Sequence, residues 1–158
     1  MKQATAAFDL PGPEHTRRLG ALLGSTASEG ATLALDGELG AGKTTLTQGL
    51  GAALGVEGPV TSPTFQLLFV HEGRLRLFHA DLYRLGDASE LTELGFDEVL
   101  GTSGVSVIEW AGRFPDVLPG DYLQLTLTYE GDGRCAHAEA RGACSSGWLE
   151  RTQAGWDR

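Results

Sequence analysis

Gly37-Glu-Leu-Gly-Ala-Gly-Lys-Thr44 is the stretch of this sequence that decides its fold. It fits the pattern G-x-x-x-x-G-K-[ST] at every fixed position. Glycines let the backbone curl until successive N–H groups point inward, where they bind phosphate oxygens. Lys43 is expected to reach the β- and γ-phosphates of a nucleotide, and the Thr44 hydroxyl is expected to bind Mg²⁺. The motif therefore predicts a phosphate-binding loop for ATP and magnesium.

The residues on either side of this loop have the pattern that a phosphate loop requires. The apolar run over residues 31–36 predicts a buried strand, and residues 44–54 carry leucines at helical spacing up to Gly55, a predicted helix C-cap. The chain has ten arginines but only two lysines, Lys2 and Lys43. A lysine at the position where a compact ammonium is required favours phosphate binding over a chance match.

The remaining pattern alternates between helical and strand periods. Helices are predicted over residues 14–28 and 87–100, the second with Gly95 as a candidate break. Strands are predicted over residues 65–70, 74–78, 105–108, 121–130 and 134–140; the first two and the last two form hairpins. We therefore expect an α/β fold: a single P-loop NTPase-like domain over residues 1–158. It would have a mixed sheet with parallel strands around the phosphate loop, antiparallel hairpins, and helices on both faces.

The C-terminal tail and the composition add further expectations. Residues 142–158 fit no element clearly, although Trp148, Leu149 and Trp156 indicate that part of the tail packs. The length of 158 residues, with 41% apolar and 21% charged residues, is typical of one soluble globular domain. No apolar run approaches the ~20 residues of a membrane span, and no signal peptide is visible, so we expect a cytoplasmic protein without membrane association. Cys135 and Cys144 are expected to be free thiols.

The formal net charge of −9 limits the partners. Such a surface repels phosphate backbones, so DNA binding and tight independent RNA binding are not expected. A protein partner with a basic face fits the charge. Solubility alone would also account for it, and the charge does not separate these two interpretations.

Two carboxylates are candidates for the magnesium site. Glu109 ends the predicted strand 105–108, where P-loop proteins place an acid near the metal, and Asp81 follows the apolar segment 75–78. Either acid alone could equally be a strand-end or helix-capping residue; beside a phosphate loop, both are expected near Mg²⁺. The stretch Thr61-Ser-Pro-Thr-Phe65 is either a plain turn or a loop that senses the γ-phosphate.

With these motifs, the chain resembles the bacterial TsaE ATPases of tRNA threonylcarbamoyladenosine (t6A) biosynthesis. The resemblance rests on four motifs in order: Gly37-Glu-Leu-Gly-Ala-Gly-Lys-Thr-Thr45, Ser62-Pro-Thr-Phe65, His79-Ala-Asp-Leu-Tyr-Arg-Leu85 and Ile108-Glu-Trp110. The first motif alone is generic, and the other three make the match specific. Ala80 departs from the aromatic residue that is common in the family, and nothing is carried over beyond Glu139.

The resemblance implies an ATPase that is weak alone and stimulated by partners. The family acts with TsaD, the threonylcarbamoyl transferase, and TsaB, its paralogue. Together they modify the adenosine next to the anticodon in tRNAs that read codons beginning with A. ATP binding would support assembly with that pair, and hydrolysis would reset the complex. The tRNA would be contacted only through the assembly.

The resemblance also implies roles for individual residues. Lys43 would hold phosphates, Thr44 and Glu109 would bind magnesium, and Asp81 would orient metal-bound or attacking water. Ser62 to Phe65 would form the switch. The nucleotide-binding loop would comprise Glu38, Leu39, Gly40, Ala41, Gly42, Lys43, Thr44 and Thr45. His15 and Thr16, at the start of the first helix, are candidates for adenine contact.

Two other functions remain open. A small-molecule P-loop kinase would need an acceptor pocket and an arginine-bearing lid. The arginines near the candidate acids are Arg84 and Arg113, and no Arg-rich lid segment stands out. The second alternative is a nucleotide-gated binding module without significant hydrolysis, since no catalytic base beyond Asp81 is evident.

Overall fold

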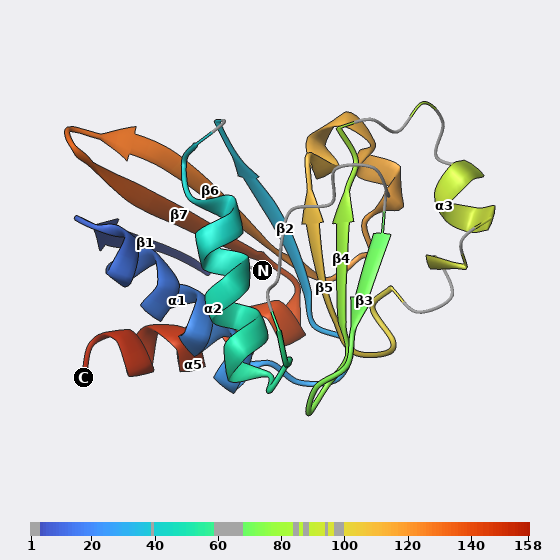
Figure 1. The fold of residues 1–158 in the computed structure, drawn as a ribbon, viewed down its shortest axis with the longest axis horizontal. Helices are drawn as coiled ribbons and strands as arrows, with labels where there is room; N and C mark the ends of the chain where they lie inside the picture. Colours follow the sequence, from blue (N-terminus) through green and yellow to red (C-terminus); the bar gives the residue numbers. More distant parts are fainter. Residues whose placement is uncertain are drawn as a thin grey trace.

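The computed structural model describes residues 4–38, 40–58, 68–83, 86, 89–93, 95–96 and 100–158. These residues form seven strands in one sheet of order β1-β7-β6-β2-β5-β4-β3 (Figure 1). The strands are β1 (Thr5–Leu10), β2 (Thr32–Gly37), β3 (Leu68–His71), β4 (Leu77–Asp81), β5 (Val105–Glu109), β6 (Tyr122–Glu130) and β7 (Gly133–Arg141). The helices are α1 (Pro13–Thr26), α2 (Lys43–Ala53), α3 (Ser89–Glu93) and α5 (Ala143–Trp156), and two 3₁₀ turns are η1 (Ala111–Arg113) and η2 (Pro115–Val117).

The sheet is mixed, as predicted. The central strand β2 is parallel to both β5 and β6, and β5 is parallel to β4. The hairpins β3–β4 and β6–β7 are antiparallel, and β1 pairs antiparallel with β7. The carboxyl ends of β2, β4 and β5 therefore meet at one edge of the sheet, where open α/β sheets bind their ligands.

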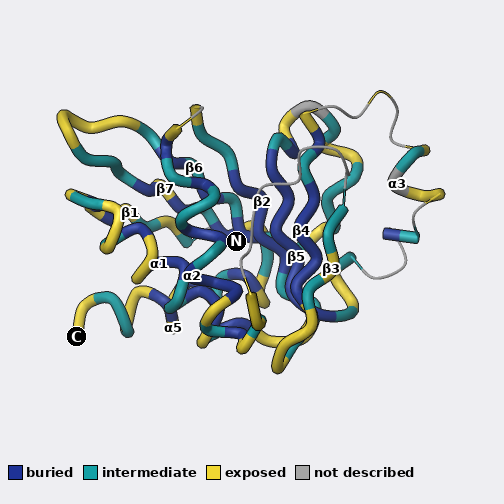
Figure 2. Tube along the Cα trace, in the orientation of Figure 1, coloured by how far each residue is buried: buried dark blue, intermediate teal, exposed yellow. Residues whose placement is uncertain are grey.

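The alternation of side chains divides the core into two layers. Leu33 and Leu35 of β2 belong to the layer under α1, α2 and α5, whereas Ala34 belongs to the opposite layer. That second layer contains Phe78 and Phe96 and is covered by the 3₁₀ turns. Figure 2 shows that the buried residues concentrate in β2, β4 and β5, in the middle of the molecule. The phosphate loop thus leaves the sheet from its most buried strands.

Helices α1 and α2 lie closer together than ordinary side chains would allow. A Cβ atom at Gly20 would lie 2.0 Å from the carbonyl oxygen of Leu46, and one at Gly49 would lie 2.2 Å from that of Arg17. Only glycine fits at these two positions. The helix that follows the phosphate loop is therefore packed directly against the backbone of α1.

The turn between β3 and β4 is longer than predicted. Residues 65–67 of the first predicted strand lie outside the described part of the chain, and the second strand is found at Leu77–Asp81 rather than at residues 74–78. The backbone N–H of Arg74 donates to the Leu54 carbonyl at 2.6 Å, and its guanidinium donates to the Gly24 carbonyl at 2.9 Å. These bonds tie the turn to the ends of α2 and α1, which moves the start of the strand towards Asp81.

The helix predicted over residues 87–100 is seen only in part. The described residues contain α3, and Gly95 has a φ of 77°, which interrupts a helix at that residue. Residues 87, 88, 94 and 97–99 lie outside the description. The helix after the phosphate loop agrees with its prediction, since Gly55 follows it with a φ of 80°.

The sequence pattern predicts neither β1 nor α5. Strand β1 extends the sheet through β7, with Phe8 opposite Ala136. Helix α5 occupies most of the tail, where Trp148 and Leu149 are both 2% exposed and Trp156 packs against the core, as expected. Cys135 and Cys144 form no disulfide. Among the described residues, none of the helices has the length and hydropathy of a membrane span.

Candidate functional site

The phosphate-loop motif joins the carboxyl end of β2 to the amino end of α2. Gly40 and Gly42 have φ values of 81° and 110°, a region of backbone conformation that favours glycine. Helix α2 begins at Lys43, so its unpaired N–H groups and the positive end of its dipole face the loop. Glu38 and Gly40 are exposed and Ala41 is buried, whereas Leu39 lies outside the described residues. The strand, glycine loop and helix follow in the predicted order.

Lys43 is buried, with an exposed fraction of 8%, although it carries a charge. Its ammonium donates a hydrogen bond to the Gly37 carbonyl and lies 4.5 Å from the centroid of the Trp110 ring. Within the described part of the chain it forms no ion pair. A carbonyl and an aromatic face do not neutralise the ammonium charge, so the site favours an incoming anion.

The two candidate acids are brought together by β4 and β5. Asp81 and Glu109 lie directly opposite each other in the parallel register. Alternation along the strands places both on the side of the sheet that carries α2. Burial raises the pKa of Asp81, the hydrogen bond from the N–H of Tyr83 at 3.0 Å lowers it, and the nearby charge of Glu109 raises it again. The net shift of the pKa is upward, chiefly because the carboxylate is partly withdrawn from water.

His79 belongs to one of the sequence motifs, although no role was predicted for it. Its side chain is completely buried, and Nε2 lies 2.6 Å from Oε2 of Glu109, which is 4% exposed. The other ring nitrogen, Nδ1, has no hydrogen-bond partner among the residues the structure describes. A histidine in an otherwise apolar strand, two residues before Asp81, is the signal that could have identified it, because both side chains then share one face. The contact orients the Glu109 carboxylate from behind.

Trp110 has an unusual backbone conformation immediately after Glu109. Its φ of 61° is the one positive value at a non-glycine residue in the described ranges. Its ring contacts both the ammonium of Lys43 and the ring of Tyr83, whose centroid is 5.1 Å away. Such conformations cost about 1–3 kcal/mol and are found mainly where the surrounding structure enforces them.

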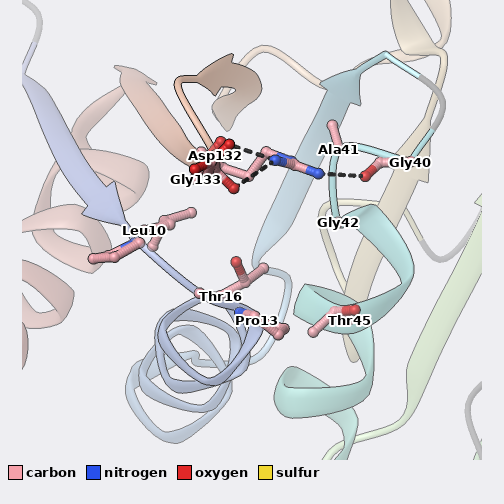
Figure 3. Close-up of a pocket in the computed structure, with 12 residues that line it drawn as sticks. Leu10, Pro13, Thr16, Gly40, Ala41, Gly42, Thr45, Asp132 and Gly133 are labelled. Carbon is pink, nitrogen blue, oxygen red and sulfur yellow. Dashed lines mark hydrogen bonds between the residues drawn. The ribbon is translucent and has the colours of Figure 1, made fainter.

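A pocket opens beside the phosphate loop (Figure 3). Its walls come from the β1–α1 junction, the loop with the start of α2, and the β6–β7 turn. The lining residues are Leu10, Pro11, Gly12, Pro13, Thr16, Gly40, Ala41, Gly42, Thr45, Asp132, Gly133 and Arg134. Of the two residues expected at the adenine, Thr16 lines this pocket. His15 is not among the lining residues, and its Nδ1 lies 3.4 Å from the Glu14 carboxylate.

The structure therefore gathers most of the predicted site residues. Lys43, Asp81 and Glu109 meet at the phosphate loop, and Thr44 lies half-buried in the first turn of α2. The expected switch, residues 62–65, lies outside the described residues, as do Arg84 and the side chain of Arg113. Apart from Thr16, the lining residues from the β1–α1 junction and the β6–β7 turn, Arg134 among them, were not predicted, because their neighbours in the site are distant in the sequence.

Comparison with known proteins gives consistent matches over most of the chain. The sequence model of the family described as "Threonylcarbamoyl adenosine biosynthesis protein TsaE" matches residues 10–136. The tRNA threonylcarbamoyladenosine biosynthesis protein TsaE of a Nostoc species is 43% identical over 135 residues, which cover 83% of this chain and 82% of that protein. The protein of the same name from Bacillus subtilis is 41% identical over 121 residues, which cover 76% of this chain and 75% of that protein.

A comparison of the fold with solved structures agrees with the sequence matches. The crystal structure of YdiB from Bacillus subtilis superposes with a TM-score of 0.84 at 30% sequence identity, and the match covers 100% of this chain and 99% of that one. This similarity extends to β1 and α5, beyond the residues that match the family's sequence model. The chain belongs to the TsaE family.

Proposed function

We propose that this chain binds and hydrolyses ATP with Mg²⁺ and thereby supports t6A modification of tRNA together with TsaD and TsaB. The observation that carries the proposal is the convergence of Lys43, Asp81 and Glu109 at the phosphate loop between β2 and α2. Membership of the TsaE family supports the biological process. The resemblance described above supports the two partners and the hydrolysis.

The loop and α2 would hold the phosphates. Backbone N–H groups around Gly40 and Gly42 and at the start of α2 would bind phosphate oxygens. Lys43, now held by a carbonyl, would exchange that contact for a charged phosphate oxygen, so that both partners of the hydrogen bond would carry a charge. Because the ammonium is already buried, phosphate binding would not require it to be withdrawn from water.

The residues present fit magnesium. Mg²⁺ takes oxygen ligands and at nucleotide sites is usually bound by one or two carboxylates, with phosphates and waters completing the shell. Among the described residues, no group of three His, Cys, Asp or Glu side chains gathers as a metal site. Glu109 has one carboxylate oxygen on His79 and one remaining, and it shares its end of the sheet with Asp81. When bound, the metal would neutralise charge on the phosphates.

The remaining assignments follow from position. Thr44, in the first turn of α2, would bind the metal through its hydroxyl. Asp81, less buried than Glu109, would orient a water molecule for attack on the phosphate. The nucleoside would occupy the pocket beside the loop, where Thr16 is one wall. With a net charge of −9, the chain would reach tRNA only through its partners.

The test is reconstitution of this chain with TsaD, TsaB, a threonylcarbamoyl donor and tRNA. We expect slow phosphate release from ATP by the chain alone, faster release with both partners, and t6A formation that depends on this chain and on ATP. Phosphate transfer to an added acceptor without release would instead identify a kinase. Full t6A formation without any phosphate release would contradict hydrolysis and leave a nucleotide-gated binding module.

A further inference from the structure

Among the described residues, His79 has a single hydrogen-bonding partner, which is Glu109. The histidine ring is completely buried in β4, and its Nε2 lies 2.6 Å from Oε2 of Glu109 on the neighbouring strand β5 (Figure 1). Its Nδ1 has no partner in the described part of the chain. A polar ring is costly to bury unless it is hydrogen-bonded. The contact with Glu109 is therefore the polar contact that accounts for a histidine at this position.

The hydrogen bond runs from the histidine to the carboxylate. An ionised carboxylate only accepts hydrogen bonds, so Nε2 of His79 carries the proton and is the donor. Oε2 of Glu109 is thereby held from inside the sheet, whereas no described residue donates a hydrogen bond to Oε1. Glu109 is thus fixed through one oxygen and has the other available for a ligand.

Asp81 is held in a similar way. Its Oδ1 accepts a hydrogen bond from the backbone N–H of Tyr83 at 3.0 Å, and no described residue donates to Oδ2. Asp81 and Glu109 lie directly opposite each other in the register of β4 and β5. Two carboxylates therefore meet at this edge of the sheet, and each of them has one oxygen held by a protein N–H.

We propose that His79 sets the cation preference of this site by keeping Glu109 from binding a cation through both carboxylate oxygens. The proposal rests on the proposed function, because it concerns the cation that would accompany ATP. Mg²⁺ demands near-ideal octahedral geometry, whereas the larger Ca²⁺ takes about six to eight oxygen ligands in flexible geometry and readily binds both oxygens of one carboxylate. A carboxylate held through one oxygen suits Mg²⁺ better than Ca²⁺. His79 is thus a positioning residue that favours the smaller cation.

The test is isothermal titration of the full chain with ATP in three buffers, which contain Mg²⁺, Ca²⁺ or EDTA. The wild-type chain should bind ATP more tightly with Mg²⁺ than with Ca²⁺. His79→Leu removes the N–H donor, so that Glu109 becomes free to turn both oxygens to the cation. We expect ATP binding with Mg²⁺ to weaken by about tenfold, as is typical when a hydrogen-bonding partner of a metal ligand is removed. Binding with Ca²⁺ should change by less than about twofold, because the second oxygen compensates for the lost orientation.

His79→Gln is the rescue variant, because its side-chain amide carries an N–H donor at the end of a chain long enough to reach Glu109. It should restore most of the preference for Mg²⁺. If His79→Leu does not fold, His79→Asn replaces it, since its shorter amide does not reach the carboxylate and the same loss of preference is expected.

His71→Leu is the matched control. His71 lies in the edge strand β3, opposite Leu77, and its Nε2 has no hydrogen-bond partner among the described residues. The variant makes the same substitution one strand away and should leave ATP binding with either cation unchanged. Thermal melting of each unliganded variant in EDTA measures any general loss of stability separately from cation preference.

Three results would overturn the proposal. If His79→Leu weakens ATP binding equally with Mg²⁺ and Ca²⁺, His79 supports the site without selecting a cation. If His79→Gln loses the preference as fully as His79→Leu, the N–H donor does not set it. If the wild-type chain binds ATP equally well with both cations, the site has no preference. A wild-type chain that binds ATP as tightly in EDTA as in Mg²⁺, or not at all, would instead contradict the proposed function, and the cation proposal with it.

Discussion

Polar groups are buried in two regions of the molecule: the seam between α1 and α5, and the strand ends at the phosphate loop. The two regions differ in how fully these groups are hydrogen-bonded. At the seam, the indole N–H of Trp148 donates to the Leu23 carbonyl at 3.0 Å, and the hydroxyls of Thr26 and Thr152 share a hydrogen bond of 2.9 Å. The Thr152 hydroxyl also donates to the Trp148 carbonyl. Every one of these groups has a partner, as is normal for buried polar atoms in a stable fold.

At the phosphate loop, some buried polar groups are not fully paired among the described residues. His79 has a buried ring nitrogen without a partner in the described chain, Lys43 faces a carbonyl and a ring, and Trp110 holds a left-handed backbone conformation. Burial and the charge of Glu109 both act to raise the pKa of Asp81. Incompletely paired and strained groups persist where the rest of the structure enforces them. The difference supports the proposal that the strand ends bind a ligand, whereas the seam stabilises the fold.

The largest effect should come from breaking the seam. Trp148→Ala removes a side chain that is 2% exposed, and we expect it to lower the free energy of unfolding by about 3–5 kcal/mol. Urea denaturation followed by circular dichroism measures this loss. Trp148→Phe, which keeps a ring and loses the hydrogen bond, should cost clearly less. If either variant, while still folded, binds ATP more than about tenfold more weakly, the two regions are not separate.

Lys43→Met should show the opposite pattern. Removing the ammonium while keeping a side chain of similar length should weaken ATP binding by about 100-fold, because charged hydrogen bonds to phosphate are lost. The free energy of unfolding should change by less than about 1 kcal/mol, since the ammonium has no ion pair to lose among the described residues. Calorimetric titration and urea denaturation measure the two quantities. Near wild-type ATP affinity would remove Lys43 from the site.

The two acids should differ in the step that they affect. Glu109→Gln keeps an oxygen that can accept from His79 but loses the charge, so we expect about a tenfold weaker dependence of ATP binding on magnesium. Asp81→Asn should retain ATP affinity and lower partner-stimulated phosphate release by about tenfold or more, because orienting water acts in the transition state. A magnesium titration combined with phosphate release separates them. The reverse pattern would exchange their roles, and no change in either would make both acids structural.

Substitutions at Asp121 and Asp81 should change the melting temperature in opposite directions. Burial alone would raise the pKa of Asp121. Hydrogen bonds from Ser145 and Cys144 at the start of α5 nevertheless hold that pKa below its usual value. Asp121 therefore stabilises the fold above its unfolded-state pKa, and this contribution is lost as the pH falls through its folded-state pKa. Asp121→Ala, which removes a helix cap, should lower the melting temperature at neutral pH by about 2–4 °C.

The pKa of Asp81 is shifted in the opposite direction. Its folded-state pKa is raised, so it favours the fold only below its unfolded-state pKa, and that contribution is lost as the pH rises through the folded-state value. Asp81→Asn should therefore raise the melting temperature of the unliganded protein at neutral pH by about 1–2 °C. Melting curves from pH 3 to pH 8 should show both differences shrinking in acid. A lower melting temperature for Asp81→Asn at neutral pH would place Asp81 among the structural residues.

Local signals in the sequence were sufficient to predict the centre of the molecule. The glycine loop, the strand before it, the helix after it and the β6–β7 hairpin each have a pattern within about a dozen residues. Helix α5 does not, because two of its four inward residues are Ser145 and Thr152, whose polar groups are paired only in the folded chain. Strand β1 depends on a partner that begins more than 120 residues later. Hydrophobic periodicity detects neither case.

The candidate site likewise contains residues that local motifs predict and contacts that depend on long-range structure. Lys43 and Glu109 lie in motifs whose spacing indicates their positions. The contact of His79 with Glu109 depends on the register of β4 against β5, and that of Arg134 with Gly40 depends on how the β6–β7 turn folds over the loop. Register and turn placement are long-range properties, so a single sequence indicates which residues carry charge but not which of them meet.

The glycine contact between α1 and α2 has a consequence for binding kinetics. Gly20 and Gly49 let the two backbones touch, so we expect the wall of the pocket on α1 and the loop at the start of α2 to move as one body. A nucleotide would then enter a cavity that is already shaped, with no helix displacement to wait for. Association measured by stopped flow should consist of a single phase whose rate rises in proportion to nucleotide concentration, whereas a required rearrangement would make the rate level off.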